Sequence, residues 1–144
     1  MIATVAVGTD GSGTAEKAVL AALELAERFG ARIVFISAYS PVDEGRLRHE
    51  KRDAPEDVQW AINPEEDVDA ILTEAEELAE EQGLRWASEA STGEPAEVLV
   101  RLADKYEADV LVIGNRGMHR RMLGSVPNSV THTANCSVYL VKTT

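Results

Sequence analysis

A glycine- and arginine-rich stretch, residues 114–130, has the composition of an anion-binding corner. It reads GNRGMHRRMLGSVPNSV, with three glycines, three arginines and no carboxylate, and it continues the apolar run DVLVIG. A helix is expected to begin at Gly124 and Ser125, and the amides and dipole of a helix start attract anions. Arg116 and Arg120 add positive charge. The stretch predicts phosphate binding, although solvated arginines and a serine that only caps the helix would explain the same residues.

A second glycine-rich corner, VGTDGSGT at residues 7–14, follows the first apolar run of the chain. Here Asp10 places a carboxylate at the expected mouth of a strand. The carboxylate is equally well explained as a turn or helix-cap acid. The glycine spacing differs from the dinucleotide motif G-x-G-x-x-G, and no Gly-Lys-Ser/Thr of a Walker loop follows.

Motifs of catalysis are lacking in the sequence. Neither Ser12 nor Ser125 has the flanking glycines of a nucleophile elbow. The chain has no H-E-x-x-H, no C-x-x-C and no carboxylate cluster at metal-ligand spacing on either corner. We therefore assign no catalytic residue and no metal ligand.

The spacing of apolar residues along the chain predicts the strands and helices that position these two corners. Short, nearly continuous apolar runs rich in β-branched residues indicate strands at residues 2–9, 31–39, 108–114 and 136–143. Residues 84–91 have a more mixed composition and are expected to form an edge strand. Apolar stripes of helical period, with core faces that include Phe29 and Tyr106, indicate helices within residues 15–29, 68–79, 98–106 and 125–133.

The alternation of strands and helices predicts one α/β domain spanning residues 1–144, with a parallel sheet and right-handed crossovers. Ligands of such sheets bind at the carboxyl ends of the strands, where the strand order reverses. Both glycine-rich corners follow strands, so we expect them to meet there. The stretch from residue 40 to 63 breaks the pattern and is expected to form a long loop.

Charge and composition exclude several classes of partner. The net charge is −11, which disfavours nucleic acid and anionic membrane surfaces as partners. No apolar run approaches the roughly 20 residues that span a bilayer, and no secretory leader is recognised. Cys136 is the single cysteine, which suits a reducing compartment. We expect a soluble, cytoplasmic protein.

With both corners placed, the chain resembles the universal stress protein family. The resemblance rests on VGTDGS near the start, SAYSP after the second strand, GEPAEVLVRLADKYEADVLVIGNRG, and LGSVPNSV before the terminal SVYLVKT. It implies an open Rossmann-like α/β sheet, of the adenine nucleotide alpha hydrolase-like kind, with strand order 3-2-1-4-5 and helices on both faces. The joint order of these motifs is more specific than any one of them.

The family's nucleotide-binding branch holds ATP with the pattern Gly-x2-Gly-x9-Gly-Ser/Thr, and the resemblance carries its roles to this chain. It implies that Gly114 lies near the ribose. The implied phosphate contacts are Gly117, Gly124, Ser125 and the amide of Val126. At the adenine end, it implies contacts from Asp10 with its neighbour Thr9, and from the backbone of Ala38.

One departure from this pattern concerns the phosphate loop. Six residues, MHRRML, separate Gly117 from Gly124, where the family pattern has nine. Six extended residues still reach about 20 Å, so a phosphate cradle remains feasible. The shorter loop would suit a ligand with a single phosphate, and some members with similar motifs prefer cyclic AMP. We rank ATP first, with cyclic AMP or AMP as the alternative.

The favoured function is therefore that of a nucleotide-binding regulator or sensor in the stress response. A slow ATPase and a scaffold that has lost nucleotide binding are the alternatives. Mg²⁺ could accompany ATP, with Asp10 as the nearest acid, but the sequence does not require it. The resemblance also implies a homodimer through the C-terminal strand, whose apolar edge at residues 137–144 would otherwise invite aggregation.

Overall fold

A computed structural model describes residues 1–10, 13–39, 65–115 and 124–142 of the chain. The strands are β1 (Thr4–Gly8), β2 (Arg32–Tyr39), β3 (Trp86–Thr92), β4 (Val110–Asn115) and β5 (Ser137–Lys142). The helices are α1 (Gly13–Phe29), α3 (Glu65–Glu81), α4 (Pro95–Lys105) and α5 (Ser125–Thr133). The expected elements are all present, and the strands begin and end within two residues of the expected positions. The loop expected at residues 40–63 lies outside the described residues.

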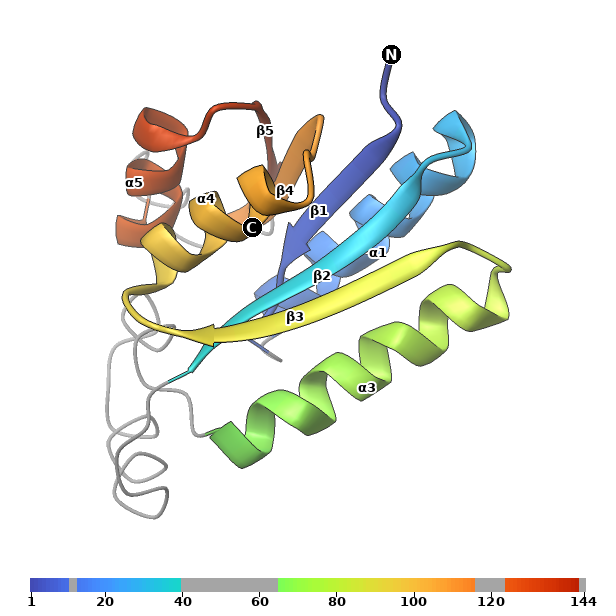
Figure 1. Ribbon diagram of the computed structural model, residues 1–144, viewed down its shortest axis with the longest axis horizontal. Coiled ribbons are helices and arrows are strands. Elements are labelled where there is room, and N and C mark those ends of the chain that lie inside the picture. The colour runs from blue at the N-terminus through green and yellow to red at the C-terminus, as the bar shows by residue number, and fades with distance from the viewer. Residues whose placement is uncertain (11–12, 40–64, 116–123, 143–144) are drawn as a thin grey trace.

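The sheet is parallel and has the order β3-β2-β1-β4-β5, which confirms the predicted fold class (Figure 1). β1 is the central strand and pairs with β2 on one side and β4 on the other. The chain builds outward from β1 to β3 and then returns to β4 and β5. The strand order therefore reverses between β1 and β4, and the carboxyl ends of these two strands form the crevice that ligands of such sheets occupy.

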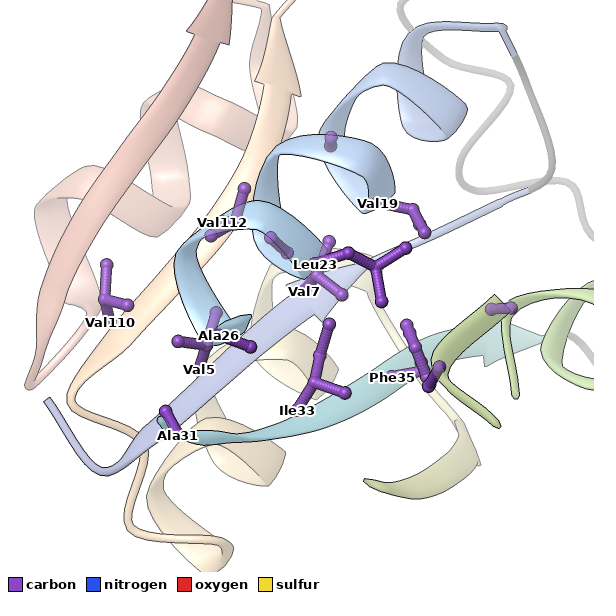
Figure 2. Close-up of a cluster of buried hydrophobic side chains, with 14 of the residues drawn as sticks. Val5, Val7, Val19, Leu23, Ala26, Ala31, Ile33, Phe35, Val110 and Val112 are labelled. Carbon is purple, nitrogen blue, oxygen red and sulfur yellow. The ribbon is translucent and has the colours of Figure 1, made fainter. Parts of the chain in front are cut away.

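Alternation along the buried strands divides the core into two layers, one on each face of the sheet. Val5, Val7, Ile33 and Phe35 belong to the layer under α1 and α3. Figure 2 shows these side chains on the face of the sheet that α1 and α3 cover, with Phe35 beside α3. Their strand neighbours face the opposite layer, under α4 and α5, and include Ala6, Val34, Ile36 and Ala38. Strands buried on both faces explain the nearly continuous apolar runs of the sequence.

Local sequence signals set the ends of the helices. Pro95 occupies the first turn of α4, and the Glu94 carboxylate accepts hydrogen bonds from the amides of Ala96 and Glu97 at 3.2 and 3.0 Å. α1 ends before Gly30, whose φ of +64° favours glycine.

Phe29 is 54% exposed, so its assignment to the core face was wrong. It lies in the last turn of α1, beside the turn that leads directly into β2.

The amino ends of the central strands are tied together by polar contacts. Asp109 accepts hydrogen bonds from the amides of Ala3 and Thr4, at 2.8 and 3.0 Å. The Arg32 guanidinium donates to Thr4 Oγ1 and to the carbonyl of Tyr106. Tyr106, expected in the core, is only half-buried, because its hydroxyl donates to Glu89 at 2.7 Å. These groups satisfy one another and anchor the start of the sheet.

Candidate functional site

The carboxyl ends of β1, β2 and β4 bring together residues predicted from separate parts of the sequence. Asp10 follows β1 and is 4% exposed, although it is a carboxylate. Ala38 lies near the end of β2 and is 1% exposed. Gly124 and Ser125 stand at the start of α5, which follows β4. The structure therefore places these predicted residues at the carboxyl end of the sheet, where the strand order reverses.

Asn115, the last residue of β4, holds the start of α5 and was not among the predicted site residues. Its side chain is 1% exposed, and its Oδ1 accepts a hydrogen bond from the amide of Gly124 at 3.1 Å. This bond fixes the beginning of α5 to the end of the strand. A polar residue between a buried apolar run and a glycine corner was the available signal for this role.

Gly114 and Gly124 are glycines for different reasons. A Cβ atom at Gly114 would stand 2.6 Å from Thr14 Cγ2 and 2.8 Å from the Thr14 carbonyl oxygen. The close packing of α1 against β4 thus explains Gly114 without a ligand. A Cβ atom at Gly124 would lie 3.5 Å from Pro127 Cδ, which is an ordinary contact. Because Gly124 has φ −62° and ψ 167°, the fold accepts a side chain there.

The start of α5 presents backbone rather than a capping side chain. Gly124 is the N-cap residue and has no side chain that could accept a hydrogen bond from the first amides of the helix. Ser125 is exposed, whereas Val126 is buried and anchors the first turn in the core under α4 and α5. A helix start with this composition attracts anions through its amides and its dipole.

Other predicted site residues are placed differently or lie outside the described residues. The Thr9 amide donates to the carbonyl of Ile36 at 3.0 Å, and Thr9 lines a cavity between α1 and α3. Arg116, Gly117 and Arg120 lie outside the described residues, so their predicted phosphate contacts remain predictions.

The described side chains offer little for covalent or metal chemistry. Across residues 1–10, 13–39, 65–115 and 124–142, no group of three His, Cys, Asp or Glu side chains could hold a metal ion. Burial raises the pKa of the Cys136 thiol, which disfavours the reactive thiolate. His132 is exposed on α5, and its Nδ1 lies 2.7 Å from the Asn128 carbonyl oxygen. The groups that could contact a ligand at the carboxyl ends of β1 and β4 are the backbone at the start of α5 and the Asp10 carboxylate.

Comparison with known proteins agrees with this arrangement. The sequence model described as the universal stress protein family matches residues 1–142. The chain belongs to this family. A universal stress protein of Mycobacterium tuberculosis is 37% identical over 145 residues, which cover 98% of this chain and 97% of the relative.

None of the helices in the described part of the chain has the length and apolar character that a membrane span requires.

Solved structures of the family share the fold of this universal stress protein. A crystal structure of a universal stress protein in complex with cAMP superposes with a TM-score of 0.72 at 32% identity, covering 99% of this chain and 98% of that one. The universal stress protein of Archaeoglobus fulgidus in complex with dAMP gives a TM-score of 0.69 at 21% identity, covering 99% and 98%. At that identity, the second likeness supports the fold alone.

Proposed function

We propose that this universal stress protein binds an adenine nucleotide in the crevice between β1 and β4 and acts as a regulator or sensor in the stress response. The start of α5 is the observation that carries the proposal. Gly124 has room for a side chain and needs no special backbone conformation, yet it carries none. A ligand that approaches the backbone closely accounts for this glycine, as a phosphate at a helix start would.

Asp10 is proposed to bind the other end of the nucleotide. It is a buried carboxylate that follows the central strand, on the other side of the crevice from the end of β4. A carboxylate accepts hydrogen bonds from ribose hydroxyls or from an adenine amino group. Ala38, buried near the end of β2, is proposed to contact the adenine through its backbone.

Among the adenine nucleotides, the short phosphate loop and one solved structure favour cyclic AMP as the ligand. The family pattern ranks ATP first, but the loop between Gly117 and Gly124 is six residues long instead of nine. A shorter loop offers fewer amides to a triphosphate. The 32% identical protein whose structure contains cAMP supports the same choice. ATP, with or without Mg²⁺, is the second candidate.

Parallel titrations test the proposal and rank the ligands. Calorimetry with ATP, AMP and cyclic AMP at one ionic strength is expected to show binding of all three, with cyclic AMP at least about tenfold tighter than ATP, or about 1.4 kcal/mol. Guanosine and cytidine monophosphates serve as controls for the base. Failure of all three adenine nucleotides to bind at millimolar concentration would remove the function. A preference for ATP would retain the site and reverse the ranking.

The proposed setting is the cytoplasm, and the proposed assembly is a homodimer through β5. This strand is an edge of the sheet, where Tyr139 is 46% exposed. Edge strands with unpaired backbone groups are templates for pairing with another chain. Analytical ultracentrifugation is expected to give twice the mass of one chain, and the mass of a single chain at micromolar concentration would contradict the assembly.

A further inference from the structure

A cavity of about 60 Å³ lies between α1 and α3, away from the start of α5. Val19 of α1 and Ala75 of α3 line it and belong to the core layer under these two helices. Ala38 and Val126, which belong to the proposed nucleotide site, lie in the opposite layer. The cavity is therefore separate from the proposed phosphate contacts. Figure 2 shows Val19 on α1, facing the sheet beside α3.

The lining of the cavity combines an apolar wall with two carboxylates. The wall is supplied by Val19, Ile71, Ala75 and Leu78, and Thr9, which follows β1, also lines the cavity. The carboxylates belong to Glu16 of α1 and Glu74 of α3, two exposed residues on the facing helices. None of the described lining residues is basic.

Among the described residues, the two carboxylates have no partner. Neither the Glu16 nor the Glu74 carboxylate forms a hydrogen bond or an ion pair there. α3 as a whole carries nine acidic residues and no basic one, so the local field is negative. Two unpaired carboxylates on facing helices favour a positively charged occupant.

The size and the wall of the cavity narrow the choice of cation. A water molecule needs roughly 10–15 Å³ of such space, so the cavity accommodates about four to six non-hydrogen atoms. A bare metal ion would gain nothing from the four apolar side chains, and the described residues offer no third acidic, histidine or cysteine ligand. A short alkyl chain fits the wall, and an ammonium head group can donate hydrogen bonds to two carboxylates at once.

We propose that the α1–α3 cavity binds a primary alkylammonium ion with a stem of about four carbons. The stem packs against Val19, Ile71 and Leu78, and the ammonium group lies between the carboxylates of Glu16 and Glu74. Such an ion combines apolar burial with charge pairing, and neither an alcohol of the same length nor an inorganic cation supplies both. The cavity shares Thr9 with the implied adenine end of the nucleotide site, but the proposal does not require a nucleotide to be bound.

Methyl NMR of the full chain tests this site with n-butylammonium chloride as the probe. Saturable shifts are expected at the methyl groups of Val19, Ile71 and Leu78. n-Butanol, which has the same length and no charge, is expected to bind at least about tenfold more weakly, the effect of losing one charge-assisted hydrogen bond at a partly exposed site. Sodium chloride at matched concentration controls for ionic strength.

A matched pair of variants separates the cavity from the general negative charge of α3. Glu74→Gln is expected to weaken n-butylammonium binding about threefold, because it removes one of two exposed carboxylates. Glu77→Gln removes the same charge from an exposed position outside the lining and is expected to leave the affinity unchanged. Equal effects of the two variants, equal binding of n-butanol, or shifts that map away from α1 and α3 would each overturn the proposal.

Discussion

The end of β4 and the start of α5 each carry a glycine, and the two glycines serve different purposes. Gly114 has no space for a Cβ atom, because the backbone and side chain of Thr14 lie against it. Gly124 has that space and an ordinary φ, yet it also lacks a side chain. The first glycine permits the packing of a helix on a strand. The second is explained by something that approaches from outside the chain.

The largest effect is expected from Gly114→Ala. Its methyl group would stand 2.8 Å from a backbone oxygen of Thr14, and the backbone cannot move away without shifting α1. Overpacking of this kind costs about 1–3 kcal/mol of unfolding free energy, which denaturant titration measures. Gly13→Ala is the control, since nothing lies within 4 Å of its new Cβ atom. Equal stability of the two variants would contradict the packing explanation.

A second substitution sharpens this prediction. Thr14→Ser removes Cγ2, which lies 2.6 Å from the Cβ position, but leaves the carbonyl oxygen. Combined with Gly114→Ala, it is expected to restore part of the lost stability and not all of it. Full recovery would show that the methyl group alone causes the clash.

A smaller effect is expected at the opposite end of β4, where polar groups of the chain satisfy one another. Asp109 precedes the strand, and hydrogen bonds from the amides of Ala3 and Thr4 lower the pKa of its carboxyl group. Asp109→Asn is expected to lower Tm at neutral pH by less than Gly114→Ala does. Asp69→Asn, on the exposed side of α3, is the control and is expected to leave Tm unchanged.

The pH dependence of this effect has a definite sign. A carboxyl group whose pKa is lower in the folded state stabilises the protein above its unfolded pKa, about 3.9 for Asp. That stability is lost as the pH falls through the folded pKa. The Tm difference between the wild-type chain and Asp109→Asn should therefore shrink as thermal melts are taken below about pH 4. A difference that grows toward acid would contradict this account.

The fold was predictable because its signals are local and repeated. Apolar runs rich in β-branched residues marked four of the strands, the mixed composition of residues 84–91 marked the edge strand β3, and Gly30, Gly83 and Pro95 marked helix boundaries. The prediction failed at Phe29, whose helical spacing suits the core but whose position in the last turn leaves it exposed. Periodicity reports the face of a helix, and it does not report where the partner surface ends.

The candidate site was predictable only in part, because its contacts join distant residues. The motifs located Asp10, Gly124 and Ser125, and the fold brings these residues together at the carboxyl ends of β1 and β4. They did not reveal the bond from the Gly124 amide to Asn115, nor the contact that requires Gly114. Both depend on how α1 and α5 approach β4, which no local pattern specifies.

The central claim is that the start of α5 is shaped by a nucleotide, and Gly124→Val tests it most directly. Valine readily adopts the extended conformation of Gly124, so Tm is expected to stay within a few degrees of the wild-type value. Its side chain would block close approach of a phosphate to the backbone. Calorimetry should then show cyclic AMP binding weakened at least about tenfold, a loss of about 1.4 kcal/mol. An unchanged affinity in the folded variant would contradict the account.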